Sequence, residues 1–269
     1  MPLDRSKLTL EQRWELADYL AKDNLSRVNK ILPQANPKDS LYSRYVKRLI
    51  DIVISIIGVV ITLPINLLIG IITFFDVGRP VFFKQKRIGK NGKQFEIKKF
   101  RNMRNTRDER GELLPASQRV TKFGKIVRKT SLDELMNFWY VLKGDMSIIG
   151  PRPLLCEYLS RYSDRHKQRL AVRPGLECPP RELKTPMRTW EDQFENDIWY
   201  VENISLKTDM LMCIRLVQFA LDRKNIEARA SATSKGIFMG YNESGEAINL
   251  EQIPEDVVQR WYKQRNEAQ

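Results

Sequence analysis

The chain has 269 residues, 42% of them hydrophobic, and carries 46 Lys and Arg against 33 Asp and Glu, a formal net charge of +13. This length allows one large domain with extensions or two small ones, and the composition excludes a disordered or collagen-like chain. Three widely spaced cysteines exclude a disulfide framework and a Cys-rich zinc site. The single histidine, His166, is expected at the surface, and no secretory signal peptide is expected at the start.

An amphipathic helix is expected over residues 9–32. Thr9 and Gln12 have the spacing of a capping box, in which each side chain bonds the backbone N–H of the other residue. Prolines follow at once and predict a linker. We therefore assign residues 1–40 to an N-terminal helical extension and its linker.

Residues 50–75 form the most hydrophobic stretch of the chain, with Asp51 as its single charged residue. A helix of this length would cross a bilayer core of about 30 Å. Pro64 lies in the middle of the run, where a proline removes a backbone donor and predicts a kink. Asn66 follows it, and its polar side chain is disfavoured in the centre of a bilayer.

Basic residues flank this run on both sides: Arg44, Lys47 and Arg48 precede it, and Arg79, Lys84, Lys86 and Arg87 follow it. Basic flanks normally stay on the cytoplasmic side of a membrane. Positive charge at both ends therefore favours a re-entrant helix that returns to the same face at Pro64, assigned to residues 41–78. A spanning helix and a buried core helix are the alternatives.

A small β-hairpin is expected next. Residues 81–88 and 94–100 read as strands, and Asn91-Gly92 between them is a strong hairpin turn signal. The segment from Arg79 to Lys129 holds 17 basic and 4 acidic residues, a surplus equal to the net charge of the whole chain. Such a block is expected to face a polyanion, either nucleic acid, anionic lipid headgroups or a substrate phosphate.

The second half of the chain predicts four helices, at residues 131–143, 154–170, 189–201 and 205–223, with a rigid loop at 144–153. One face of the last helix suits a core or a membrane surface; it consists of Met210, Leu211, Ile214, Val217 and Leu221. Trp190, Trp199 and Tyr200 are expected to pack in the core or anchor at an interface rather than bind sugar. Residues 225–269 are assigned to a peripheral polar extension.

Together these elements predict an α+β fold that is mostly helical and membrane-associated. It should combine a Pro-kinked re-entrant hydrophobic helix, a small β-hairpin and amphipathic interfacial helices.

The residues most suited to chemistry lie around Ser131, Asp133 and Glu134. Ser131 and Glu134 alone are explained by a capping box at the start of a helix. A helix N-terminus also attracts phosphate, and its field should lower the pKa of Asp133 and keep this residue an ionised nucleophile. A carboxylate that attacks phosphorus forms an acyl phosphate and divides one transfer into two easier steps.

Arginines near this segment could bind phosphoryl oxygens. Arg128 precedes Ser131, and Arg152 lies in the stiff segment Pro151-Arg152-Pro153. The neighbouring Glu134 has two candidate roles, as a ligand of Mg²⁺ or as a base for a second acceptor.

Four motifs in register resemble those of the bacterial sugar transferase family, the monotopic polyprenyl-phosphate phosphoglycosyl transferases. They are KKFRNM (98–103), RKTSLDEL (128–135), NFWYVLKGDMSIIGPRP (137–153) and VRPG (172–175). The resemblance covers residues 45–224, and it implies that residues 79–224 form the catalytic domain. The segment LECPPRELKTP (176–186) departs from the family's donor-binding loop.

The resemblance implies transfer of a sugar 1-phosphate from a UDP-sugar to a polyprenyl phosphate, with a covalent aspartyl intermediate and release of UMP. Asp133 and Glu134 match the family's catalytic dyad, with Mg²⁺ as cofactor. Lys99, Arg101, Arg128 and Arg152 match its phosphate-binding and structural positions. The implied location is the cytoplasmic face of a bacterial plasma membrane, in contact with anionic lipids. A second copy of the chain is a further candidate partner.

Two other functions are compatible with parts of the sequence. A non-catalytic membrane adaptor that keeps the fold would explain the divergent segment 176–186, but the intact dyad and arginines argue against it. A nucleic-acid surface would explain the basic block, but the chain has no recognition-helix pattern or aromatic stacking stripe. We therefore expect no nucleic-acid partner.

Overall fold

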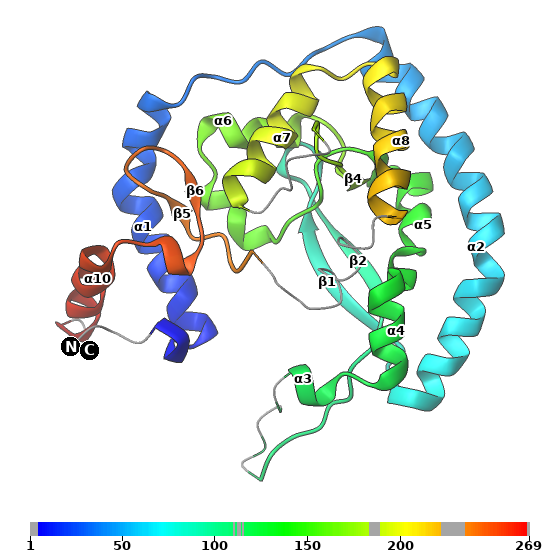
Figure 1. Ribbon diagram of the computed structural model, residues 1–269, viewed down its shortest axis with the longest axis horizontal. Helices are drawn as coiled ribbons and strands as arrows, with labels where there is room; N and C mark the ends of the chain where they lie inside the picture. Colours follow the sequence, from blue (N-terminus) through cyan, green and yellow to red (C-terminus); the bar gives the residue numbers. More distant parts are fainter. Residues whose placement is uncertain are drawn as a thin grey trace.

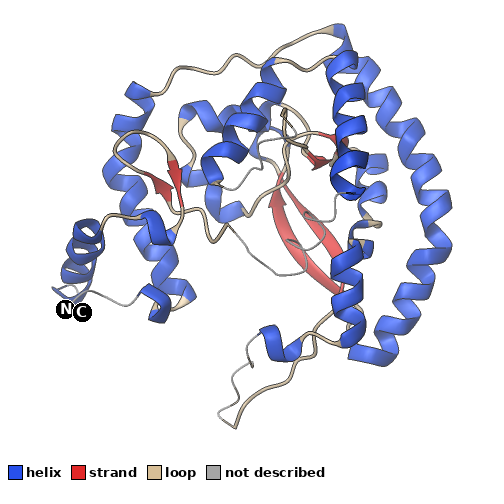
Figure 2. Ribbon diagram, in the orientation of Figure 1, coloured by secondary structure: helices blue, strands red, loops and turns tan. Residues whose placement is uncertain are grey.

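A long helix, α2 (Lys47–Val77), runs along one side of the molecule in the computed structural model (Figure 1). The structure describes residues 5–109, 111, 114, 116–182, 189–221 and 235–267. Helices dominate these residues, and the strands form small two-stranded sheets (Figure 2). The prediction of a mostly helical α+β fold is confirmed.

The helix α2 continues through Pro64 without an interruption. It bows along its length, and its two halves do not fold back on each other (Figure 1). A proline costs one backbone hydrogen bond, which a helix can absorb by bending. The predicted return of the helix at Pro64 is therefore not seen, while the helix itself is apolar and long enough to cross a membrane. Most of its large apolar side chains are exposed, which is compatible with membrane association.

The inner side of α2 packs against α5 (Asn137–Lys143). At Gly58 the two helices come so close that a Cβ atom would lie 2.5 Å from Cδ1 of Phe138. The guanidinium of Arg48 donates to the carbonyl oxygens of Val141 and Leu142, at 2.6 and 2.8 Å, in the last turn of α5. Close packing and these hydrogen bonds fix the first half of α2 on the domain.

The β-hairpin has the predicted strands and turn. Strands β1 (Phe82–Ile88) and β2 (Gln94–Phe100) pair antiparallel, with Phe82 opposite Phe100. Asn91 at the turn has a positive φ of 56°, which an asparagine tolerates. At the open end of the hairpin Arg101 donates to the carbonyl oxygen of Pro80 at 2.9 Å.

The helix predicted at residues 131–143 does not start at Ser131. Ser131 ends α4 (Lys122–Thr130) in a left-handed conformation, with φ of 55°, and its side chain caps no helix. A single 3-10 turn over Leu132–Glu134 follows, and α5 begins only at Asn137. Gly144 ends α5 as predicted. The capping-box interpretation is therefore wrong, because the left-handed Ser131 reverses the chain.

The loop predicted at 144–153 contains a strand. Strand β3 (Ser147–Ile149) pairs parallel with β4 (Gly175–Glu177), a partner that local sequence could not reveal. A Cβ at Gly175 would lie 2.1 Å from the backbone nitrogen of Gly150, so this close approach requires glycine. Residues 154–170 were expected as one helix, and they form two 3-10 segments and the short α6 (Asp164–Lys167) instead; the 3-10 segments are Cys156–Arg161 and Gln168–Ala171.

The last two predicted helices are confirmed as α7 (Trp190–Glu202) and α8 (Leu206–Leu221). Trp190 and Tyr200 are buried, as core residues should be. The face of α8 that carries Met210, Ile214 and Val217 is exposed. The side chain of Leu221 and residues 222–234 lie outside the described part.

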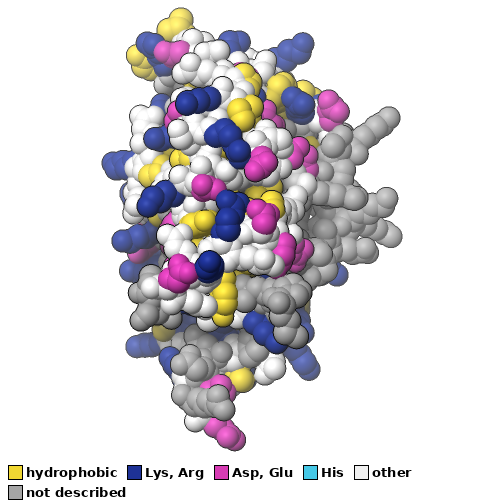
Figure 3. Space-filling model, turned by 90° about the vertical axis from the view of Figure 1, so that its left-hand side faces the viewer, with side chains coloured by type: hydrophobic (Ala, Val, Ile, Leu, Met, Phe, Trp, Pro, Cys, Tyr) yellow, Lys and Arg dark blue, Asp and Glu magenta, His cyan; other side chains and the backbone are white. Residues whose placement is uncertain are grey.

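The C-terminal segment is not a peripheral tail. It forms β5 (Gly240–Tyr241), β6 (Ala247–Ile248) and α10 (Glu255–Glu267), which pack against α1 (Leu10–Ile31). The capping box predicted for α1 is present. Apolar side chains of α1, β6 and α10 share one core with Met239, which precedes β5, and this core overcomes the polar composition; it includes Leu16, Leu20, Met239, Ile248, Val258 and Trp261. The outer face of this unit carries interspersed acidic and basic side chains (Figure 3).

His166 is buried rather than at the surface, because the C-terminal hairpin covers it. Its Nδ1 lies 3.0 Å from the hydroxyl of Tyr241 and its Nε2 lies 2.9 Å from a carboxylate oxygen of Glu195. Glu195 also forms a bidentate pair with Arg165. Although His166, Glu191 and Glu195 are close enough to hold a metal ion, these existing contacts explain the cluster as part of the core.

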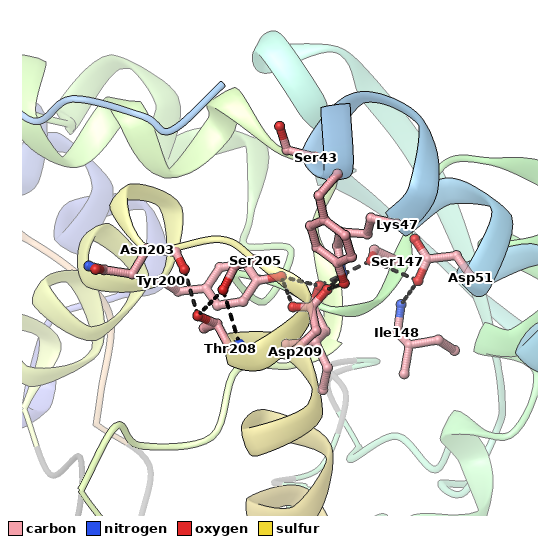
Figure 4. A network of polar contacts seen from close by, with 12 residues as sticks. Ser43, Lys47, Asp51, Ser147, Ile148, Tyr200, Asn203, Ser205, Thr208 and Asp209 are labelled. Carbon is pink, nitrogen blue, oxygen red and sulfur yellow. Dashed lines mark hydrogen bonds and ion pairs between the residues drawn. The ribbon is translucent and has the colours of Figure 1, made fainter. Parts of the chain in front are cut away.

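A buried polar network joins α2 to the centre of the domain (Figure 4). The carboxylate of Asp51 accepts hydrogen bonds from the hydroxyl of Ser147 and the N–H of Ile148, both at 3.0 Å. The ammonium of Lys47 lies 2.8 Å from the carboxylate of Asp209 on α8, and this carboxylate also accepts the hydroxyl of Tyr200 at 2.6 Å. Lys47 and Asp51 of α2 thus point inward and bind α8 and β3, and Tyr200 of α7 shares the carboxylate of Asp209 with Lys47.

This network predicts a large effect of Asp209→Asn on stability. The amide can still bond Tyr200, but it leaves the buried ammonium of Lys47 without a counter-charge, which should cost about 3 kcal/mol. Thermal unfolding of the detergent-solubilised protein measures this loss. The control Asp256→Asn removes the exposed ion pair with Arg260 and should cost less than about 0.5 kcal/mol; equal effects of the two variants would contradict the prediction.

Candidate active site

Three segments meet at the dyad Asp133 and Glu134. Lys99, near the end of β2, places its ammonium 3.1 Å from Oε1 of Glu134 and 3.9 Å from Oδ2 of Asp133. Arg152, which follows β3, donates to the same Oε1 of Glu134 and, at 2.5 Å, to Oε2 of Glu177 on β4. The structure therefore brings together four of the predicted residues, and Glu177 joins them.

The environment of Asp133 differs from the one predicted. A three-residue 3-10 turn has no helix dipole to stabilise an anion. Burial of the side chain raises the pKa of Asp133, and the nearby Lys99 lowers it by less. The prediction of a lowered pKa is therefore wrong. A carboxylate with a raised pKa is more basic, and so more nucleophilic, once it is ionised.

Glu134 shows the opposite behaviour. Burial opposes its ionisation, but the charges and hydrogen bonds of Arg152 and Lys99 outweigh this effect and lower the pKa of Glu134 to about 2. Two adjacent carboxylates with pKa values pushed apart indicate two roles. Glu134 stays ionised at neutral pH and is a poor base, whereas Asp133 is the group whose charge can change.

Arg101 and Arg128 are placed differently from Lys99 and Arg152. The guanidinium of Arg101 binds the backbone oxygens of Pro80 and Met103, at 2.9 and 3.4 Å. Arg128 lies in the last turn of α4, just before the segment that carries the dyad. Its carbonyl oxygen accepts the N–H of Ser131 at 3.3 Å, but its guanidinium forms no hydrogen bond or ion pair with any residue that the structure describes and so is available to an anion.

Sequence reasoning missed Arg87 and Glu177. Arg87 lies on β1, where burial and then the charge of Arg152 lower the pKa of its guanidinium, while Glu134 acts in the opposite sense. Because side chains alternate along a strand, the sequence could have placed Arg87 on the same face of β1 as Gln85, two residues earlier. Glu177 carried no local signal, because only the pairing of β4 with β3 brings it to Arg152.

The site offers oxygen ligands to a hard cation. Both bonds to Glu134 described above go to Oε1, so neither uses Oε2. Carboxylate oxygens of this kind suit Mg²⁺, which usually takes one or two of them and completes its shell with water and substrate phosphate. The carboxylate oxygens of Asp133 and Glu134 therefore fit Mg²⁺, the cofactor expected from the sequence.

Comparison with known proteins supports one family. Residues 42–223 match the family model described as bacterial sugar transferase. The uncharacterized sugar transferase EpsL of Bacillus subtilis is 39% identical over 189 residues, which cover 70% of this chain and 94% of that protein. An undecaprenyl-phosphate galactose phosphotransferase of Salmonella typhimurium is 33% identical over 208 residues, 67% of this chain and 41% of the relative.

A third relative is an Aeromonas hydrophila protein named UDP-N-acetylgalactosamine-undecaprenyl-phosphate N-acetylgalactosaminephosphotransferase. It is 32% identical over 185 residues, 66% of this chain and 44% of that protein. The chain thus spans most of the Bacillus protein but less than half of the Salmonella and Aeromonas proteins.

The ion pairs of Glu134 predict a pH-dependent effect of Arg152→Met. Because the folded pKa of Glu134, about 2, lies below its ordinary 4.5, its ionisation stabilises the fold above pH 4.5, and this contribution is lost as the pH falls toward 2. The variant should lose about 1–2 kcal/mol at pH 7, and its deficit against wild type should shrink below pH 4.5. Thermal unfolding across pH tests this; a constant deficit, or an equal one in the exposed control Arg104→Met, would contradict it.

Proposed function

The chain belongs to the bacterial sugar transferase family, and on this premise we propose that it transfers a sugar 1-phosphate from a UDP-sugar to a polyprenyl phosphate, such as undecaprenyl phosphate, and releases UMP. The Salmonella and Aeromonas relatives are named for transfer to undecaprenyl phosphate. One observation carries the proposal: Lys99 pairs with Asp133 and Glu134, and Arg152 pairs with Glu134, in a domain that carries a long exposed apolar helix. Such a step would begin glycan assembly on a lipid carrier.

In the first step, a carboxylate oxygen of Asp133 attacks the phosphorus that carries the sugar. A bond from this oxygen to phosphorus forms, the bond from phosphorus to the bridging oxygen breaks, and UMP leaves with the electron pair. The ammonium of Lys99, 3.9 Å from Asp133, is placed to offset charge that builds up on the phosphoryl oxygens.

In the second step, an oxygen of the polyprenyl phosphate attacks the same phosphorus. The bond to Asp133 breaks, its carboxylate is regenerated, and a polyprenyl diphosphate sugar leaves. Arg128, with its uncommitted guanidinium, and Arg101 are the proposed contacts of the incoming phosphates. Arg152 stays on Glu134 and Glu177, so its proposed role is to keep Glu134 in position.

Mg²⁺ is the proposed cofactor, with Glu134 as its protein ligand. When bound, the ion would neutralise charge on the donor diphosphate. Because its pKa is about 2, Glu134 presents an ionised carboxylate to such an ion at neutral pH. We assign Glu134 to metal binding rather than to base catalysis for this reason.

The proposed location is the cytoplasmic face of a bacterial plasma membrane. Exposed apolar residues of α2 would enter the lipid, and the basic segment from Arg79 to Lys129 would meet anionic headgroups. The phosphate of a polyprenyl lipid lies at this headgroup level, next to the dyad. Both ends of α2 on this face stay part of the proposal, reached by the bow of the helix and not by a fold-back at Pro64.

The variant Asp133→Asn tests the nucleophile. It should abolish UMP release from a panel of UDP-galactose, UDP-glucose and UDP-N-acetylgalactosamine, at least 10³-fold below wild type, because an amide oxygen is a weak nucleophile. Intact-protein mass spectrometry should show a phosphosugar adduct in wild type alone. Asp256→Asn, on the distant α10, should retain activity. Turnover by Asp133→Asn would refute the role, and an inactive wild type would favour the adaptor function.

The pH profile tests the electrostatics of the dyad. Asp133 must be ionised to attack, so kcat/KM should fall on the acid side through a pKa above 3.8. Lys99→Met removes the cation that lowers this pKa, so the acid limb should move to higher pH. Lys98→Met, on the exposed neighbouring residue, should leave the limb in place. A limb that moves to lower pH in Lys99→Met, or equally in both variants, would contradict the assignment.

A further inference from the structure

A pocket with a volume of about 390 Å³ lies at the N-terminal end of α2. The linker that leads into α2, the turn of the β-hairpin, the loop before β4 and the first turns of the helix itself all line it. Five of the lining residues are basic and two are acidic. The volume is within the range of small-molecule sites, about 300–1,000 Å³. The excess of positive charge favours an anion as the ligand.

This pocket and the dyad lie at opposite ends of one pair of strands. Ser147, the first residue of β3, and Arg173, two residues before β4, line the pocket. Glu177 is the last residue of β4, and Arg152 follows the end of β3. Because the two strands run parallel and each spans roughly 10 Å, their starts and their ends form two distinct places. The pocket is therefore separate from the candidate active site.

Some of the charges in the pocket already have partners within the protein. The guanidinium of Arg44 binds the carboxylate of Asp39. The ammonium of Lys47 binds Asp209, and the carboxylate of Asp51 accepts its two hydrogen bonds from β3 (Figure 4). Both acidic side chains of the lining are thus committed to other groups, and neither forms an ion pair with the remaining basic residues that the structure describes in the pocket.

Three basic side chains of the lining keep unused N–H donors: Lys38, Lys90 and Arg173. The ammonium groups of Lys38 and Lys90 form no hydrogen bond or ion pair with any residue in the described ranges. Arg173 donates from Nε to the carbonyl oxygen of Gly144 at 3.0 Å, and its two terminal nitrogens bond to no other described residue. Cations from the linker, the hairpin turn and the loop before β4 are therefore available to one ligand.

We propose that this pocket binds a phosphate group, as a site distinct from the dyad. Phosphate oxygens are strong acceptors, and ammonium and guanidinium groups are their usual partners in proteins. Two sources share this chemistry: the headgroup of an anionic phospholipid and a soluble phosphate ester. The outer side of the same turns of α2 and of the segment before it is apolar and exposed, at Leu41, Tyr45 and Leu49. A membrane at this surface would bring headgroups to the pocket, so the lipid is the expected source.

Thermal unfolding tests this site without turnover. The detergent-solubilised full chain receives phosphatidylglycerol, with zwitterionic phosphatidylcholine as the control. In a second arm it receives glycerol 3-phosphate, with sodium chloride at equal ionic strength as the control. A ligand that binds only the folded state raises Tm as its concentration rises, and the series gives an apparent Kd. Phosphatidylglycerol should raise Tm, and phosphatidylcholine should not.

Two matched double variants assign the binding to the pocket. Lys38→Met with Lys90→Met removes two of the three available cations, and it should fold like wild type because both side chains are exposed and unpaired within the described residues. It should weaken the apparent Kd at least about tenfold, because each lysine contributes a hydrogen bond to a charged group. Lys86→Met with Lys93→Met removes the same charge from exposed lysines of the hairpin outside the pocket. This control should change Kd less than about twofold.

Hydrogen–deuterium exchange locates the ligand. Bound phosphate should slow exchange in residues 38–44, 89–93 and 171–175 of the wild type, and the pocket double variant should lose this effect. Slowing confined to residues 128–135 would place the ligand at the dyad and overturn the proposal. Equal Kd values in the two double variants, or no shift of Tm with either ligand, would also overturn it. A shift with glycerol 3-phosphate alone would support the site and assign it to a soluble ester.

Discussion

The site depends on the two ion pairs that the partly buried guanidinium of Arg152 makes. Arg152 binds Glu134 and Glu177, and its backbone oxygen accepts a hydrogen bond of 2.8 Å from Arg169. Arg169 is itself buried and paired with Asp197 on α7 at 2.7 Å. Arg152 thus joins the turn that carries the dyad to strand β4, and Arg169 connects Arg152 to helix α7. This arrangement keeps Glu134 ionised and leaves the neighbouring Asp133 as the more basic of two adjacent carboxylates.

A helix on a soluble domain normally buries its apolar side chains and exposes its polar ones, and α2 does the opposite. Its exposed residues are apolar, and its buried ones include Lys47, Asp51 and Ser55. Because Asp51 binds the backbone of β3, the orientation of α2 fixes the strand that leads to Arg152. A membrane around the outer face of α2 would therefore be coupled through one short strand to the candidate site.

The two terminal extensions form one unit. The family match ends at residue 223, yet α1 and the C-terminal hairpin enclose a common core with part of the central domain. The buried Arg161 connects them, since it pairs with Asp18 on α1 and donates to the carbonyl oxygen of Phe238. A net polar composition did not prevent folding here, because a few large apolar side chains at the right positions suffice to bury a core.

Local sequence patterns were sufficient to predict four features: the capping box at Thr9, the turn at Asn91, the long apolar helix and the end of α5 at Gly144. The sequence also identified the family and predicted Asp133 and Glu134 as the catalytic dyad. Each of these signals lies within a few consecutive residues or in a motif that can be matched directly.

Other features become visible only in the folded chain: the turn at Ser131, the pairing of β3 with β4, the burial of His166 and the direction in which each pKa of the dyad moves. These properties depend on segments far apart in the chain. Glu177 reaches Arg152 through strand pairing, and burial changes the charge balance of Asp133. Desolvation and long-range contacts exist only once the chain has folded, so no local pattern could encode them.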